Sequence, residues 1–270
     1  MAQASLAFSR KYEKPMSETV LQSLNEEGVL SLTLNRPNKK NAFSIEQWLA
    51  FREAIEAAKT DSRVACLLIT GAGSDFSSGT DLNDFSESDE EHPFDKTARA
   101  LVEFDKPIIC AAKGIAVGGG ATLLLQADII YVGQSLKMRF PFVSLGLVPE
   151  WGSSYALSAS IGSRRAAELM YTAEYINAER AVEMGIATAA VADDVLLDHA
   201  MNKAKEIAQW PISSLVATKQ AMRAHHVPQI LAAMDRENEG MAKTAGQAEN
   251  IEAIMAFIEK RQPNFKQFRK

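Results

Sequence analysis

The sequence predicts a mixed α/β fold, and three observations along its 270 residues support this. Short, continuous apolar runs, such as VACLLIT at 64–70 and PIICAA at 107–112, are typical of strands buried on both faces. Helical periodicity separates these runs, and such strand–helix alternation indicates an α/β architecture. From about residue 193 onward the chain is nearly all helix-like. We therefore divide it into an α/β core, residues 1–210, and a helical C-terminal region, residues 211–270.

The first half of the chain supplies the expected strands and one well-marked helix. Residues 28–35 (GVLSLTLN) alternate and are rich in strand formers. Ser44 is suited to cap a helix that runs to about Lys59, with Gln47 as the capping-box partner three residues later. Residues 128–132 (DIIYV) complete the expected core strands.

After Gly152 the pattern becomes helical. Pro211 and Pro228 are expected to separate the helices of the C-terminal region, because proline disrupts a helix interior. The expected helices of this part cover residues 153–162, 164–172, 178–185, 194–209, 212–225, 230–243 and 249–261.

Composition and charge argue against several functional classes. The net charge of −5 provides no basic surplus for nucleic acid, where contacts to phosphates supply most of the affinity. No apolar stretch reaches the ~18–20 residues that span a bilayer. Cys66 and Cys110 lie in apolar runs without CxxC spacing, which indicates buried free thiols. We expect a cytoplasmic protein with no nucleic-acid or membrane partner and, since no His, Asp and Glu have ligand spacing, no metal.

Two glycine-rich loops are candidates for ligand binding. Gly118, Gly119 and Gly120 follow a buried strand and open an apolar helix, whose N-terminus presents unpaired N–H groups. A second loop, FSSGTDL at 76–82, also follows a buried strand. If the two loops converge, one N–H group from each could form an oxyanion hole. A plain tight turn is the alternative for the triplet, which matches neither a Walker A loop nor a GxGxxG motif.

Glu150 is the candidate acid/base. It lies between Pro149 and Trp151, just before an expected helix. Partial desolvation by these neighbours would raise its proton affinity and make it a usable base and acid near neutral pH. The alternative is an acid that stabilises the positive N-terminus of the helix.

These features, in this order, resemble the crotonase superfamily. FSSGTDLNDF is similar to its F-x-[AS]-G-x-D-[LI] signature, and KPIICAAKGIAVGGG is similar to its second glycine-rich signature. The match starts at LTLNRPNKKNAFS and ends at FIEKRQPNF, so it extends from about Val29 to Phe265. The resemblance implies a spiral of ββα turns with a C-terminal helical trimerisation region, in a homotrimer or a dimer of trimers.

The resemblance also implies an acyl-CoA thioester as substrate, with no cofactor besides the coenzyme A that the substrate carries. It assigns the oxyanion hole to the backbone N–H groups of Ser78 and Gly119. The residues expected to line the acyl pocket, or to pack beneath it, are Phe142, Leu145 and Trp151. The positions assigned to coenzyme A binding are Lys39, Lys40, Ser78, Gly79, Asp81 and Leu82, with Phe257 and Lys260 reaching the coenzyme A of a neighbouring subunit.

Departures from the family pattern predict the reaction. Hydratases of this superfamily carry two glutamates, at the positions that Thr122 and Phe142 occupy here. Hydration needs a base for the water and an acid for the α-carbon, so hydratase activity is not expected. The segment PFVSLGLVPEWGSSYAL resembles the peroxisomal-type Δ3,Δ2-enoyl-CoA isomerases, whose single catalytic glutamate corresponds to Glu150. The resemblance thus implies that Glu150 moves a proton from C2 to C4 of a 3-enoyl-CoA, giving the 2-trans product.

Other functions of the same fold stay open at this point. A thioesterase or a decarboxylase would share the scaffold. A dehalogenase would also need a nucleophilic aspartate and a nearby histidine, and only His92 lies near the first glycine loop in sequence. A non-catalytic acyl-CoA-binding module would fit the loss of the two hydratase acids, although Glu150 in its full motif argues against it.

Overall fold

A computed structural model describes residues 17–81 and 92–269, so Leu82 lies outside the described residues. A six-stranded sheet runs through their centre in the order β1-β2-β3-β4-β6-β9. β1 pairs antiparallel with β2, and every later pairing in this sheet is parallel. The mixed α/β class is confirmed. The strands are β1 (Val20–Leu24), β2 (Val29–Leu34), β3 (Cys66–Gly71), β4 (Ile108–Ala112), β6 (Ile129–Gly133) and β9 (Ala189–Val191).

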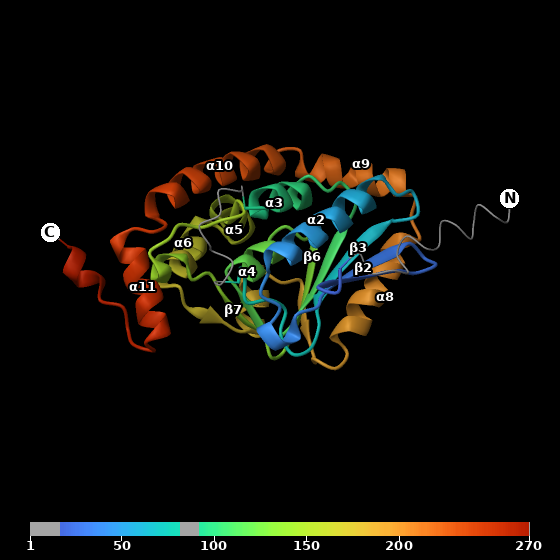
Figure 1. The fold of residues 1–270 in the computed structure, drawn as a ribbon. Coiled ribbons are helices and arrows are strands. Elements are labelled where there is room, and N and C mark those ends of the chain that lie inside the picture. Colours follow the sequence, from blue (N-terminus) through green and yellow to red (C-terminus); the bar gives the residue numbers. More distant parts are fainter. Residues whose placement is uncertain (1–16, 82–91, 270) are drawn as a thin grey trace.

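Helices cover both faces of this sheet, which explains the continuous apolar runs in the sequence. In β3, Leu67 and Ile69 join the larger core beneath α2 (Ile45–Thr60), while Leu68 joins a second core beneath α8 (Leu196–Ala208). Figure 1 shows α2 and α8 on opposite sides of the strands. Because successive side chains point to opposite faces, a strand between two helical layers must be apolar throughout.

A small three-stranded sheet was not expected from the sequence. It consists of β5 (Ile115–Val117), β7 (Lys137–Arg139) and β8 (Tyr175–Ile176) in that order. Each strand has only two or three residues, too few to show a period of two. β5 leads directly into the glycine triplet, so this sheet helps to place the candidate site.

The cap of α2 is confirmed in part. The Oγ atom of Ser44 accepts the N–H of Gln47 at 3.2 Å. The Gln47 side chain does not complete a capping box, because its Nε2 atom donates to the carbonyl of Thr19 at 2.8 Å. It therefore fastens α2 to the segment before β1.

The remaining helices follow the expected order. Pro211 precedes α9, but Pro228 lies in the first turn of α10, which starts four residues earlier than expected. Proline is tolerated there, because the first helical N–H groups have no intrahelical acceptor. α10 packs against α3 and α5, as Figure 1 shows. These helices are α3 (Phe94–Val102), α4 (Gly119–Leu124), α5 (Ser153–Ile161), α6 (Ser163–Thr172), α7 (Ala178–Met184), α9 (Ile212–Arg223), α10 (His226–Thr244) and α11 (Ala248–Ile258), with 3₁₀ turns η1 (Pro37–Lys39), η3 (Phe142–Leu145) and η4 (Phe265–Phe268).

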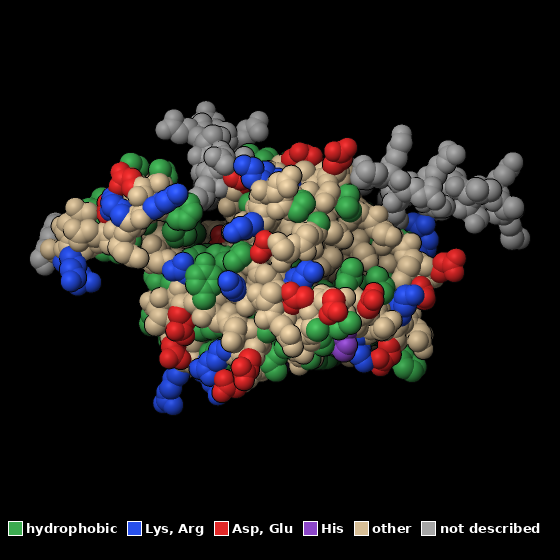
Figure 2. Space-filling view, turned by 90° about the horizontal axis from the view of Figure 1, so that it is seen from below, with side chains coloured by type: hydrophobic (Ala, Val, Ile, Leu, Met, Phe, Trp, Pro, Cys, Tyr) green, Lys and Arg blue, Asp and Glu red, His purple; other side chains and the backbone are tan. Residues whose placement is uncertain are grey.

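The surface carries charges of both signs. On the face shown in Figure 2, acidic and basic side chains are interspersed with small apolar patches. Within residues 17–81 and 92–269, none of the helices is long and apolar enough to cross a membrane.

Candidate active site

The two glycine-rich loops lie against each other, which the spacing of the motifs alone could not show. Ser77 forms a parallel bridge with Ala116 of β5, and the N–H of Val117 donates to the Ser77 carbonyl at 3.0 Å. This pairing brings the first loop against the triplet. A β-carbon on Gly79 would lie 3.1 Å from the nitrogen of Gly119, so the two backbones touch.

The structure corrects the assignment of one oxyanion-hole amide. The N–H of Ser78 donates to the carbonyl of Lys40 at 2.9 Å, so this donor is already used. Within the described residues, the N–H groups of Thr80 and Gly119 have no hydrogen-bond acceptor. The nitrogen of Thr80 lies 3.8 Å from the position of a β-carbon on Gly119. Thr80 and Gly119, and not Ser78, therefore present the free amides.

A bridge between Phe43 and Thr80, which the sequence does not reveal, explains why the free amide belongs to Thr80. Phe43 pairs with Thr80: the N–H of Phe43 donates to the Gly79 carbonyl, and the N–H of Asp81 donates to the Phe43 carbonyl, at 2.8 and 2.9 Å. In such a bridge the N–H of the middle residue points away from its partner. The Thr80 amide is thus turned away from Phe43.

Glu150 lies beside these amides. Its Oε1 atom is 3.2 Å from the position of a β-carbon on Gly119. The residue is half-buried, in a turn where Trp151 and Gly152 both have left-handed backbone angles, with φ of 60° and 67°. Two such angles in sequence redirect the chain sharply before α5 begins at Ser153.

The surroundings of Glu150 favour proton transfer. Loss of solvation, and secondarily the charge of Glu237, raise its pKa to about 8. A carboxyl group with a pKa near the ambient pH can both accept and return a proton. This arrangement supports an acid/base role for Glu150.

Glu237 is a residue that sequence reasoning missed. It lies on α10, is 6% exposed, and accepts the N–H groups of Gly152 at 2.6 Å and Ser154 at 2.9 Å. It thus serves the N-terminus of α5, the alternative role considered for Glu150. A signal was present, because Glu237 continues the apolar stripe of Ile230, Ala233 and Met234 at helical spacing.

The positions that carry glutamates in hydratases hold no acid. Thr122 is fully buried, and its Oγ1 atom donates to the carbonyl of Gly119 at 3.4 Å. Phe142 is 4% exposed and belongs to the main core. Neither side chain can activate a water molecule as a carboxylate would.

The residues expected at the acyl pocket lie mostly in the core. Trp151 is 1% exposed, packs edge-on against Trp48 and Phe94, and donates its indole N–H to the Ala98 carbonyl at 3.2 Å. Like Phe142, it supports the site from beneath. Leu145 is half-buried in η3.

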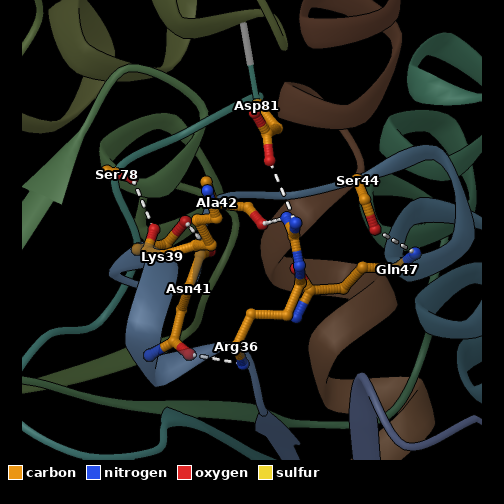
Figure 3. Close-up of polar contacts among 9 residues, drawn as sticks. Arg36, Lys39, Asn41, Ala42, Ser44, Gln47, Ser78 and Asp81 are labelled. Atoms are coloured by element: carbon orange, nitrogen blue, oxygen red, sulfur yellow. Dashed lines mark hydrogen bonds and ion pairs between the residues drawn. The ribbon is translucent and has the colours of Figure 1, made fainter. Parts of the chain in front are cut away.

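The loop that carries Lys39 and Lys40 borders the site. Both side chains are exposed, and the carbonyl of Lys39 accepts the Ser78 hydroxyl at 3.4 Å. Arg36 pairs with Asp81 at 3.0 Å and also donates to the carbonyl of Ala42 (Figure 3). Asp81 therefore braces the first glycine loop through Arg36.

The two C-terminal positions assigned to coenzyme A are open to solvent. Phe257, on α11, is 68% exposed, and Lys260 follows the end of this helix. α11 packs against η3 and lies at one edge of the molecule in Figure 1. Contact of these two side chains with a neighbouring subunit's ligand stays a prediction. In the part of the chain that the structure describes, no cluster of three or more His, Cys, Asp or Glu could hold a metal ion.

Known proteins of similar sequence and structure come from one family. The profile of the enoyl-CoA hydratase/isomerase family matches residues 25–269. The chain is 34% identical to the 1,2-epoxyphenylacetyl-CoA isomerase of Escherichia coli K12 and 31% identical to the 2,3-dehydroadipyl-CoA hydratase of the same strain, each alignment covering 93% of this chain and 99% of the relative. The crystal structure of an enoyl-CoA hydratase/isomerase from Pseudoalteromonas atlantica T6c superposes with a TM-score of 0.88 at 34% identity, covering 92% of this chain and 99% of the other.

Proposed function

Because this chain belongs to the enoyl-CoA hydratase/isomerase family, the crotonase superfamily, we propose that it is a Δ3,Δ2-enoyl-CoA isomerase. At the coarser level it is a crotonase-type enzyme that processes an acyl-CoA thioester. The proposed reaction moves the double bond of a 3-enoyl-CoA to the 2-trans position.

One observation carries this proposal: the carboxyl group of Glu150 lies beside the free amides of Thr80 and Gly119. The two N–H groups would bind the thioester oxygen and stabilise the negative charge that develops on it. The raised pKa of Glu150, about 8, suits a group that must take up a proton and release it again.

The proposed steps need only this one carboxylate. Glu150 accepts the proton from C2, the C2–H bond breaks, and its electron pair delocalises over the thioester carbonyl and the C3–C4 double bond. Glu150 then donates the same proton to C4, and the double bond between C2 and C3 remains. No water is consumed and no electron leaves the substrate, so the atoms balance.

The absence of acids at Thr122 and Phe142 supports isomerisation over hydration. The first relative compared above is named an isomerase, and the second is named a hydratase. An assay must therefore distinguish the conjugated product from a hydrated one.

The test is turnover of 3-hexenoyl-CoA by the wild type and by Glu150→Gln. We expect the wild type to form 2-trans-hexenoyl-CoA, and the variant to lose roughly 10²- to 10⁴-fold in kcat while still binding the thioester. Glu179→Gln is the matched control, since Glu179 is exposed on α7, and it should leave kcat unchanged. Near-wild-type turnover by Glu150→Gln, or a 3-hydroxyacyl product alone, would reject the proposal.

We further propose that the enzyme works as a homotrimer or a dimer of trimers. α11 exposes a group of large apolar side chains that a neighbouring subunit could cover. Exposed apolar patches of this kind are typical of subunit interfaces. Light scattering on the purified protein should give three or six times the chain mass, and a monomer would contradict this. The cytoplasmic location expected from the sequence stays a prediction. The exposed apolar side chains of α11 are Ile251, Ile254, Met255, Phe257 and Ile258.

A further inference from the structure

Glu237 connects the C-terminal helix α10 to the turn that carries Glu150. Its Oε2 atom accepts the N–H of Gly152 at 2.6 Å, and its Oε1 atom accepts the N–H of Ser154 at 2.9 Å. Both amides belong to the start of α5, 83 or more residues away in sequence. The side chain is 6% exposed, although a buried carboxylate is costly unless hydrogen bonds compensate for the lost water. The cost of burying this carboxylate indicates that Glu237 has a specific role at this position.

We propose that Glu237 is a positioning residue for Glu150: it fixes the turn from Pro149 to Gly152, and it occupies the helix amides that would otherwise stabilise an ionised Glu150. The inference rests on the proposed function, in which Glu150 is the group that reacts with substrate. It does not require Glu237 to touch the substrate.

The turn that carries Glu150 has an unfavourable backbone angle at Trp151, which its neighbours must hold. Trp151 has a φ of 60°, in a region that costs a non-glycine residue about 1 kcal/mol or more and persists only where the surroundings hold it. Gln126 donates to the Trp151 carbonyl at 2.9 Å, and the Trp151 indole donates to Ala98 at 3.2 Å. The N–H of Ser153 donates to the Glu150 carbonyl at 3.1 Å, and Glu237 supplies a further anchor on the amides of Gly152 and Ser154. The turn is thus held from α3, from the end of α4 and from α10.

The N-terminus of α5 and the charge of Glu237 act on the ionisation of Glu150 in opposite directions. The N-terminus of a helix carries a partial positive charge that favours a nearby anion. Glu150 precedes α5 by only three residues, so this field would favour its ionised form and lower its pKa. Glu237 binds two amides at this helix N-terminus instead, and its own negative charge acts against ionisation of Glu150. The pKa of Glu150 is raised first by burial and then by Glu237, which agrees with this arrangement.

Other charged groups lie near Glu237, and most of them form contacts of their own. Burial raises the pKa of Glu237, while its hydrogen bonds to Ser154 and Gly152 and the charge of Arg236 oppose the increase. Farther along the contact between α3 and α10, Arg99 pairs with Asp95 at 2.7 Å and with Asp235 at 2.6 Å. At the start of α10, His226 and the Tyr155 hydroxyl form a hydrogen bond at 3.1 Å. Arg99 with its two aspartates and His226 with Tyr155 thus form separate contacts, while the charge of Glu237 contributes to the raised pKa of Glu150.

The test compares Glu237→Gln with the wild type by two independent readouts. The first is the titration of Glu150, followed by NMR of protein labelled with ¹³C at the glutamate carboxyl groups, with the Glu150→Gln spectrum for assignment. The second is the pH profile of kcat/KM for 3-hexenoyl-CoA. We expect both midpoints to fall by about one unit or more, because a nearby like charge has been removed. Glu239→Gln, an exposed acid on the same helix, is the control and should shift neither midpoint.

Glu237→Asp separates geometry from charge. It keeps the charge but shortens the reach, so kcat should fall much more than KM changes, while the Glu150 midpoint stays high. If Glu237→Gln does not fold, the kcat of Glu237→Asp still tests the inference. An unchanged Glu150 midpoint in Glu237→Gln, or unchanged kcat in Glu237→Asp, would overturn the inference. If the wild type shows no isomerase turnover but its Glu150 midpoint falls in Glu237→Gln, the proposed function fails and the link between the two glutamates stands.

Discussion

A carboxylate oxygen of Glu150 lies 3.2 Å from the point that a β-carbon on Gly119 would occupy. The same point is 3.6 Å from the Cα atom of Gly79. Gly119 does not have a left-handed backbone angle, so its backbone conformation does not require glycine. Glycine is needed here because a side chain would fill the space beside Glu150. The space lies where the Glu150 carboxyl group meets the free N–H groups of Thr80 and Gly119.

Gly119→Ala should therefore reduce activity without unfolding the protein. The added methyl group would occupy the space where the thioester oxygen is expected to bind, so we expect kcat/KM to fall by roughly 10²-fold, comparable to the loss of one oxyanion donor. The melting temperature should change little. Gly120→Ala is the contrasting variant, because its β-carbon would lie 2.2 Å from the Ser77 carbonyl oxygen and should destabilise the fold. Full activity in Gly119→Ala would place the substrate oxygen elsewhere.

The raised pKa of Glu150 also predicts a stability effect. The folded protein holds this proton up to about pH 8, while the unfolded chain releases it near the ordinary value of 4.5. Stability from this group is therefore fully present below pH 4.5, and it is lost as pH rises from 4.5 to 8. Glu150→Gln removes the penalty, so at pH 8 it should be more stable than the wild type by a few kcal/mol.

Denaturant titrations at pH 5 and pH 8 measure this effect. The advantage of Glu150→Gln should be small at pH 5 and larger at pH 8. Equal stability of the two proteins at both pH values would show that Glu150 titrates normally. The gain at pH 8 would mean that Glu150 is kept at a cost in stability, which agrees with the acid/base role proposed for it.

The parts of the fold that the sequence predicts are those with a repeating physical pattern. β3 and β4 are recognisable because two helical layers demand apolar side chains on both faces, and α2 is recognisable from its Ser44 cap. β5 and β8, with three and two residues, are too short to carry a pattern and form only because a partner strand is present.

The residues of the candidate site also divide into those that the sequence predicts and those that it does not. Glu150 and the glycine triplet can be found in the sequence because they lie in continuous motifs. The sequence could not show that the free amide belongs to Thr80 and not to Ser78, because the direction of each amide depends on the pairing of Thr80 with Phe43. Glu237 lies far from Glu150 in sequence, and only the packing of α10 against α5 brings them together.

The identity of the second amide can be tested by replacing a single N–H with an ester oxygen. With an α-hydroxy acid incorporated at position 80, the Thr80 N–H is removed, and we expect kcat to fall by roughly 10²- to 10³-fold with little change in melting temperature. The same replacement at position 78 removes the donor to Lys40 and should mainly lower stability. If instead the position 78 ester loses turnover and the position 80 ester does not, the original assignment of Ser78 is restored.

Lys39 and Lys40 provide the last prediction. Their side chains are exposed, and their carbonyl groups accept hydrogen bonds from Ser78, so both residues lie on the loop that borders the site. The double variant Lys39→Gln/Lys40→Gln should raise KM for 3-hexenoyl-CoA several-fold at low salt and leave kcat unchanged, because cations near the phosphates contribute to binding and not to proton transfer. Lys203→Gln, on α8 at the other face of the sheet, is the control. Since exposed charges are screened, the difference in KM should shrink as salt is added, whereas a loss of kcat would mean that the backbone of the glycine loop had moved.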